Sequence, residues 1–229
     1  MVKTGVNPAQ PDDEFMRSTH VTSCGQIIGG ILAEDEKTAR IAIKLVKVKY
    51  EDISPVIVTI DDAIKYDSRH PTPSLFNPYK HEAGNVEKCL NEATLTLESE
   101  CRIGGQEHFY FETNALLCKP IDNCREMDVH ISCQNLDLAK MDIARALGVK
   151  FHLVHTHARR LGGGFGGKEQ RFSLLAGTVA TAAFKFNRPV RCMLDRDEDM
   201  MHSGTRHPFL SKYKVGFEPN GKINTGLYI

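Results

Sequence analysis

A run of five glycines between residues 160 and 169 contains the residue types best suited to holding a ligand. The run reads RLGGGFGGKE. Glycine has no Cβ, so successive N–H groups in such a run can converge on a phosphate, an oxo group or the edge of a pterin. A tight turn that needed only positive φ would use one or two glycines. The run therefore predicts a cofactor-binding loop.

Two familiar anion-binding loops compete for this run, and neither pattern is complete. Gly162, Gly164 and Gly167 satisfy the dinucleotide pattern G-x-G-x-x-G, with Asp195 as a distant ribose acceptor. The preceding residues, FHLVHTHARR, are too polar for the buried first strand of such a fold. The run also fits most of a P-loop, but Glu169 stands where a Ser or Thr would ligate magnesium. A carboxylate there would repel a triphosphate, which argues against an ATP or GTP site.

Three histidines before the loop form an alternative candidate for metal ligation. On a strand, His155 and His157 would project to the same face, with His152 just before them. Pairs of this kind occur in zinc and iron hydrolases. We expect no carboxylate at a matching spacing to complete a ligand set, and the sequence favours a solvated strand.

Longer ordered blocks carry a resemblance to a known family. The run is followed by PVRCMLDRDEDM at 189–200 and RHPF at 206–209, and GGQEHFYFET precedes it at 104–113. Together these blocks resemble the molybdenum-cofactor region of the xanthine dehydrogenase/oxidase family, which includes the aldehyde oxidases. The resemblance extends over nearly all of the chain, starting from CGQIIG at 24–29. It implies an oxidoreductase fragment that belongs to a molybdenum hydroxylase of purines, converting hypoxanthine and xanthine to urate.

The resemblance also implies roles for individual residues. Gln134 matches a glutamine that approaches an oxygen ligand of molybdenum, and Phe165 matches a phenylalanine whose backbone amide lies against the metal, while its ring packs the loop. Glu169 matches a substrate-side glutamate that hydrogen-bonds the purine ring, whereas aldehyde oxidases usually have an apolar residue there. The implied contacts to molybdopterin, the cofactor that carries molybdenum, come from Gly163, Gly164, Phe165, Gly166 and Gly167.

Other parts of the reaction are expected outside this chain. In the family, the general base is a glutamate far downstream, so no catalytic residue is expected here and the isolated chain is expected to be inactive. FAD and two [2Fe–2S] clusters are expected only in missing upstream domains. Two features depart from the family pattern. Leu138 stands where xanthine-oxidising relatives have a lysine, and the histidine-rich strand before the loop is atypical. An aldehyde oxidase fragment and a non-catalytic remnant or binding module remain the alternatives.

Composition limits the class of partner. The 229 residues have a formal net charge of zero and no basic stripe, which favours a small-molecule substrate over nucleic acid or an anionic membrane surface. No apolar stretch is long enough to span a bilayer, and no signal-peptide segment is apparent at the N-terminus. Seven scattered cysteines without a C-x-x-C pair are typical of reduced thiols. We expect a cytoplasmic protein, with the peroxisome as the alternative, and a homodimer for a complete enzyme.

Apolar periodicity predicts an α/β protein with mixed sheets. By resemblance, a partial hammerhead-like α/β domain occupies residues 1–66, a connecting loop 67–90, and the truncated first part of the molybdopterin-binding domain 91–229. The acidic run at 195–199 is interpreted as a solvated turn. Strands are predicted at 26–33, 46–50, 93–103, 116–121, 127–133 and 190–194. Helices are predicted at 34–46, 61–64 and 136–147, the last capped by Asn135 and stopped by Gly148, and from Phe172 to a stop at Asn187.

Overall fold

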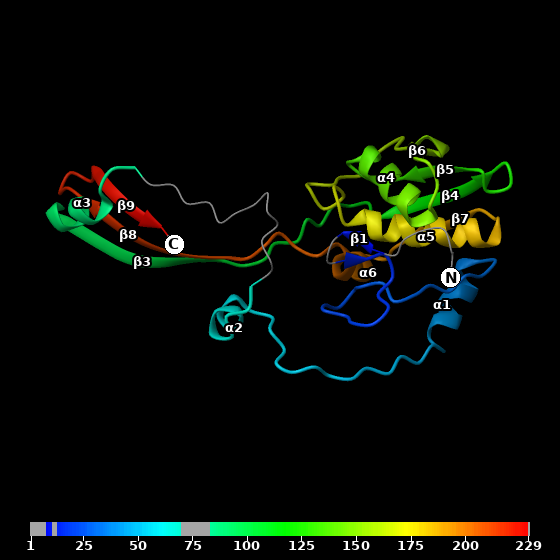
Figure 1. Ribbon diagram of the computed structural model, residues 1–229, viewed down its shortest axis with the longest axis horizontal. Coiled ribbons are helices and arrows are strands. Elements are labelled where there is room, and N and C mark those ends of the chain that lie inside the picture. The colour runs from blue at the N-terminus through cyan, green and yellow to red at the C-terminus, as the bar shows by residue number, and fades with distance from the viewer. Residues whose placement is uncertain (1–7, 11–12, 70–82, 229) are drawn as a thin grey trace. The chain divides into compact units, whose positions relative to one another are not determined.

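The computed structural model describes residues 8–10, 13–69 and 83–228 (Figure 1). Contacts group the chain into two units, residues 1–48 with 107–206, and residues 49–106 with 207–229. The larger unit contains the glycine-rich run. The domain boundaries predicted around 67–90 stay a prediction, and residues 70–82 of that loop lie outside the described ranges.

The larger unit is built on a four-stranded sheet with the order β6-β5-β4-β7. Its central pair is antiparallel, with Leu116 opposite Ile131, and β7 is antiparallel to β4. In contrast, β5 and β6 are parallel, with Met127 opposite Val154. A parallel pair needs a crossover, which a helix between the two strands provides. The strands are β4 (Ala115–Ile121), β5 (Glu126–Ile131), β6 (Val154–His157) and β7 (Val190–Met193).

Two helices pack against each other and against this sheet (Figure 1). The crossover helix α4 (Leu136–Leu147) begins where the Asn135 side chain accepts the N–H of Leu138, and it ends at Gly148 in the left-handed conformation. The second helix, α5 (Phe172–Phe186), ends at Asn187, which is also left-handed. Both helices have the bounds that the sequence predicts, because these end signals are local.

The core of the larger unit lies between the helices and one face of the sheet. Residues of the strands alternate, so that Cys118 and Val129 are fully buried while their neighbours are partly exposed. From the helices, Ile143 and Ala180 complete the same cluster. Burial raises the pKa of the Cys118 thiol to about 12, so this cysteine is a packing residue.

The smaller unit contains a second sheet of three antiparallel strands with the order β3-β8-β9. Leu95 pairs with Phe217 and Tyr213 with Tyr228. Two short helices precede the sheet in this unit, and the first is joined to it by ion pairs of Arg102 with Asp61. The elements are α2 (Ile60–Lys65), α3 (Val86–Glu92), β3 (Leu95–Ile103), β8 (Phe209–Phe217) and β9 (Ile223–Tyr228).

The N-terminal region differs from the prediction. Of the elements predicted before residue 50, only a shorter helix forms, α1 (Glu36–Ile43). The predicted strands 26–33 and 46–50 are wrong: these residues form no strand, and Leu32 and Val46 are exposed. A strand requires a neighbour for its backbone hydrogen bonds, and no described segment pairs with either stretch. The remaining short elements are β1 (Pro8–Gln10), β2 (Asp13–Glu14) and the 3₁₀ turn η1 (Phe151–Leu153).

The acidic run is a helix and not the solvated turn that the sequence suggests. Asp195 caps α6 (Arg196–Ser203) in a reciprocal capping box with Glu198. Asp199 is only 1% exposed, and one of its carboxylate oxygens accepts the backbone N–H of Asn114 (2.8 Å) and its side-chain amide (2.7 Å). The run therefore connects α6 to the segment before β4.

A helix that crosses a bilayer needs about 20 mostly apolar residues. Within the described ranges, every helix is too short or too polar to cross a membrane.

The Asp199 contacts generate a stability prediction. Asp199→Ala removes the acceptor of the buried Asn114 backbone N–H and one of the two acceptors of its side-chain amide, so we expect a loss of about 3 kcal/mol in the free energy of unfolding. Urea denaturation of the chain measures this. Asp197→Ala on the exposed side of the same helix should change it by less than about 1 kcal/mol. Equal losses in the two variants would contradict the role of Asp199.

A second prediction concerns Asp142, which is fully buried in α4 and has one carboxylate oxygen without a partner among the described residues. Burial raises its pKa, against the opposing effects of the Ser173 hydroxyl and the Arg145 charge. Since the folded-state pKa lies above the unfolded one, stability falls as the pH rises from the unfolded pKa through the folded pKa, and the loss is complete above the folded pKa. Asp142→Asn should therefore be more stable than the parent chain at neutral pH, and this advantage should vanish as the pH falls through the carboxyl range. Denaturation curves over that range, with exposed Asp137→Asn as control, test the sign. A parent chain that is more stable at neutral pH would show it to be wrong.

Candidate cofactor site

The glycine-rich run forms a loop between β6 and α5 in which three residues have positive φ. Gly163 and Gly166 have φ of +92° and +90°, and Phe165 between them has φ of +50°. Two backbone hydrogen bonds close turns in the loop, from Gly167 N–H to the Gly164 carbonyl (2.8 Å) and from Glu169 N–H to the Gly166 carbonyl (3.3 Å). A non-glycine residue rarely adopts positive φ, so the Phe165 conformation marks a constrained site.

Other glycines are required because neighbouring side chains lie against the backbone. A Cβ on Gly164 would lie 2.4 Å from Gln134 Oε1, and one on Gly167 would lie 2.7 Å from His108 Cγ. Gly162 is similarly close to the Cβ of Glu112, at 2.4 Å. These approaches explain the number of glycines, which exceeds what the turns need.

Gln134 lies where β5 leads into α4, and its side chain reaches the loop. Its Oε1 accepts the N–H groups of Gly166 (2.9 Å) and Lys168 (3.3 Å), and its own N–H donates to the Lys168 carbonyl (2.8 Å). Because Oε1 is used by the loop, the Nε2 amide group points elsewhere, and it donates to no described residue. Gln134 is exposed, so this amide is available to a ligand.

Three successive backbone N–H groups of the loop also lack an acceptor among the described residues. They belong to Gly163, Gly164 and Phe165. Buried or half-buried N–H groups are normally paired, and Gly164 is buried. Rows of N–H groups in alternating backbone conformations form concave sites for anions and polarised oxygen or nitrogen atoms. The loop therefore fits a ligand that supplies acceptors, as the ring nitrogen and oxygen atoms of a pterin do.

The side chains of Phe165 and Glu169 are exposed at this loop. The Phe165 ring is 75% exposed and lies beside Gly163, so it packs against the loop itself and not in the core. Glu169 precedes α5 by three residues and makes no ion pair within the described part of the chain. It is not a helix-terminal acid, and its carboxylate is free to meet a ligand.

A network of polar side chains around the buried Lys168, beneath the loop, could not be predicted from the sequence. Lys168 is 0% exposed, and its ammonium lies 3.1 Å from Glu112 Oε2, 2.8 Å from Ser132 Oγ and 4.7 Å from the centre of the Tyr110 ring. Glu112 and Ser132 are distant in sequence, and the only local signal is a lysine within a glycine run. The same signal suggested a P-loop, but the lysine is turned into the protein.

The histidine-rich strand has carboxylate partners that the sequence did not reveal. His155 Nε2 lies 2.7 Å from Glu126 Oε2, and His157 Nε2 lies 2.8 Å from Asp128 Oδ1. Sequence spacing gives no sign of these carboxylates, because it is the parallel pairing of β5 and β6 that places the side chains together. Among the described residues, however, no group of three or more His, Cys, Asp or Glu side chains is arranged to hold a metal ion.

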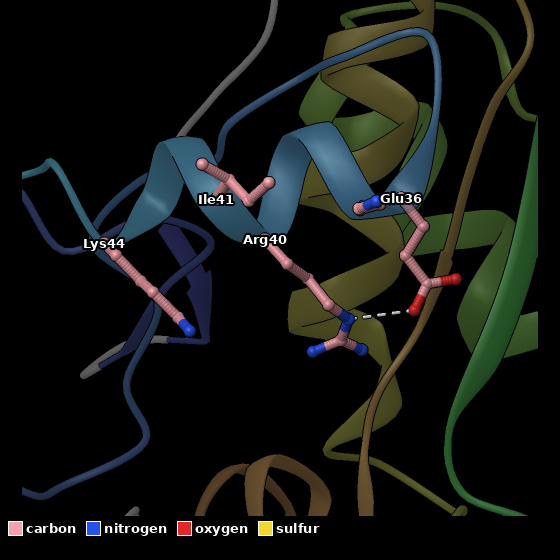
Figure 2. Close-up of a pocket in the computed structure, with 5 residues that line it drawn as sticks. Glu36, Arg40, Ile41 and Lys44 are labelled. Carbon is pink, nitrogen blue, oxygen red and sulfur yellow. Dashed lines mark hydrogen bonds and ion pairs between the residues drawn. The ribbon is translucent and has the colours of Figure 1, made fainter.

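A surface hollow of about 460 Å³ along α1 is unrelated to the loop (Figure 2). Figure 2 shows Arg40 donating to Glu36 across one turn of the helix, at 2.9 Å. The hollow is lined by α1 and the residue after it, and no predicted site residue contributes. Its lining residues are Glu36, Lys37, Arg40, Ile41 and Lys44.

Comparison with known proteins agrees with the geometry of the loop. Residues 69–226 match the molybdopterin cofactor-binding domain family, and residues 2–54 match the a/b hammerhead domain of aldehyde oxidase and xanthine dehydrogenase. The chain is 46% identical to xanthine dehydrogenase of Calliphora vicina over 98% of its length and 48% identical to xanthine dehydrogenase/oxidase of Gallus gallus over 93%. It is 40% identical to aldehyde oxidase 3 of Mus musculus over 95%. The chain spans only 15–16% of the length of these relatives.

Solved structures show the same fold. The aldehyde oxidoreductase of Desulfovibrio desulfuricans superimposes with a TM-score of 0.79 at 20% identity, covering 95% of this chain and 24% of that one. Quinoline 2-oxidoreductase of Pseudomonas putida gives a TM-score of 0.68 at 18% identity over 83% of this chain and 24% of that one. The predicted mixed α/β class and the predicted resemblance are confirmed. The chain therefore belongs to the family of molybdopterin cofactor-binding domains that xanthine dehydrogenase/oxidase and aldehyde oxidase share.

Proposed function

We propose that the glycine-rich loop and Gln134 hold the pterin and metal of a molybdopterin cofactor. The observation that carries this proposal is the row of three N–H groups, of Gly163, Gly164 and Phe165, that have no acceptor among the described residues. Gly166 and Gly167 complete the backbone surface on which the cofactor would lie. Gln134 and Phe165 would be the residues nearest molybdenum.

The protein groups at this site would orient the cofactor and polarise its ligands. When bound, molybdopterin supplies two-electron redox chemistry at molybdenum. The Gln134 amide is a neutral donor, so it can hydrogen-bond a negatively polarised ligand without losing a proton. The Phe165 N–H is fixed by a constrained backbone and would present a second donor without reorganisation.

We infer that the substrate is a purine and that the chain is part of an enzyme oxidising hypoxanthine and xanthine. Glu169 supports this inference, because its exposed carboxylate can accept hydrogen bonds from ring N–H groups at the end of the loop. The relatives named xanthine dehydrogenase are also more similar to this chain than the aldehyde oxidase is. No residue of this site is proposed as the general base.

Aldehyde oxidation is the second candidate function. The 40% identity to aldehyde oxidase 3 favours it, whereas the carboxylate at position 169 does not. A third possibility, a pterin-binding module without catalysis, concerns the chain in isolation. Loading with cofactor and turnover of the two substrate classes distinguish the three.

We also propose an organisation for the protein. A hammerhead-like domain would occupy residues 1–66 and a cofactor domain 91–229; the matched ranges 2–54 and 69–226 support this division. The complete enzyme would be a homodimer, as is usual in the family. All seven cysteines are free thiols, which supports a reducing compartment, the cytosol or alternatively the peroxisome.

Cofactor binding can be tested by adding one methyl group to the loop. In Gly164→Ala, the new Cβ displaces Gln134, which breaks the hydrogen bonds from Oε1 to the loop. We expect the molybdenum and pterin content to fall by about tenfold or more while the circular dichroism spectrum is unchanged. Metal analysis and pterin fluorescence measure the content. Gly30→Ala, where no atom lies within 4 Å of the added Cβ, is the control and should load normally. Normal loading of Gly164→Ala would refute the site.

Substrate choice can be tested at Glu169 in the longer enzyme that contains this segment. Glu169→Val should lower kcat/KM for hypoxanthine by about tenfold or more and leave benzaldehyde within about threefold, because only the purine loses a hydrogen-bond acceptor. Glu169→Gln keeps the size and one acceptor and should lose less. Similar losses for both substrates would remove the purine-binding role of Glu169.

A further inference from the structure

The Lys168 side chain, with its terminal ammonium group, is buried beneath the loop. The side chain is 0% exposed, although lysine is rarely buried without a partner. Its three donor directions are used by Glu112 Oε2 (3.1 Å), Ser132 Oγ (2.8 Å) and the face of the Tyr110 ring (4.7 Å). No direction remains for a ligand, so Lys168 acts on the loop through the protein.

One carboxylate oxygen of Glu112 accepts three hydrogen bonds of the same network. Oε2 accepts the Ser132 hydroxyl (2.6 Å), the Gly162 N–H (2.8 Å) and the Lys168 ammonium. The Glu112 N–H also donates to the Gly162 carbonyl (3.2 Å). Partial burial opposes ionisation, but these hydrogen bonds and the Lys168 charge outweigh it and lower the pKa of Glu112 below its ordinary value. The carboxylate is therefore ionised and paired.

The network grips the loop at its two ends and leaves the middle free. Glu112 holds Gly162, the first glycine, and Lys168 follows Gly167, the last glycine. Between them lie the three N–H groups without an acceptor. Ser132 belongs to the segment that leads from β5 to Gln134, so the same network also connects the loop to the strand that presents the amide.

We propose that Lys168 and Glu112 are positioning residues that clamp the two ends of the glycine-rich loop and thereby fix its free N–H groups relative to Gln134. This proposal deepens the proposed cofactor site and rests on it for the identity of the ligand. The clamp itself is a property of the loop and can be measured without cofactor. A charge pair with one fully buried member is suited to this role, since removing Glu112 leaves the buried Lys168 charge uncompensated.

The first test is amide hydrogen exchange by NMR on the 229-residue chain. The loop amides that are protected by hydrogen bonds, those of Gly162, Gly166, Gly167 and Lys168, report the clamp. In Lys168→Met we expect Gly162, Gly166 and Gly167 to exchange at least tenfold faster, with the amides of α5 unchanged. Lys150→Met, at an exposed lysine, is the control and should match the parent chain. Unchanged loop exchange, or faster exchange of α5 and the loop alike, would overturn the clamp, because the second result indicates only global destabilisation.

Glu112→Gln provides a second test of the clamp, which applies even if the Lys168 variant does not fold. The amide oxygen can still accept the Gly162 N–H, but the charge that compensates Lys168 is lost. We expect the same loop amides to exchange faster than in the parent, by a smaller factor than in Lys168→Met. Parent-like exchange in this variant would show that the charge pair is not needed.

Loading with molybdopterin separates the clamp from the proposed function. If both proposals hold, Lys168→Met should contain at least fivefold less molybdopterin than the parent, and Lys150→Met should contain as much. A loosened loop with normal loading would refute positioning toward the cofactor. A parent chain that shows the protected loop but takes up no molybdopterin would refute the proposed function and leave the clamp supported.

Discussion

The parallel pairing of β5 and β6 is the constraint on which the site depends. Parallel strands have their carboxyl ends at the same edge of a sheet, so the residues that follow each strand meet there. Gln134 follows β5 and the glycine-rich loop follows β6. The crossover through α4 makes the pairing possible, and the packing of α4 and α5 on one sheet face holds it. The side-chain contact of Gln134 with the loop is thus a consequence of topology, achieved across 32 residues of sequence.

The sequence predicted those elements whose signals are local. Helix α4 has a capping Asn135 and a terminating Gly148, and both perform these roles in the structure. Elements that depend on a distant partner were predicted less well. The strands expected at 26–33 and 46–50 have suitable residues but no strand partner among the described segments. The acidic residues 195–199 were interpreted by charge alone, because burial of Asp199 depends on Asn114, which lies 85 residues away.

The candidate site shows the same division. The glycines, Gln134 and Glu169 could be proposed as site residues from the sequence, because the residue pattern of the loop and its resemblance to a family identify them. The Glu112, Ser132 and Lys168 network could not, because no periodicity relates residues separated by 20 and 36 positions. The carboxylates that pair with His155 and His157 were missed for a similar reason: they come from a neighbouring strand, and register is a tertiary property.

The crowding around Gly162, Gly164 and Gly167 has a consequence for inherited variation. Every amino acid other than glycine has a Cβ, and at each of these positions that atom would lie 2.4–2.7 Å from a neighbouring side chain. Every missense change at these codons therefore forces a neighbouring side chain to move, however small or polar the encoded residue. Tolerance in this stretch of the gene is set by backbone clearance, so ordinary scales of amino-acid similarity will underestimate the severity of such alleles.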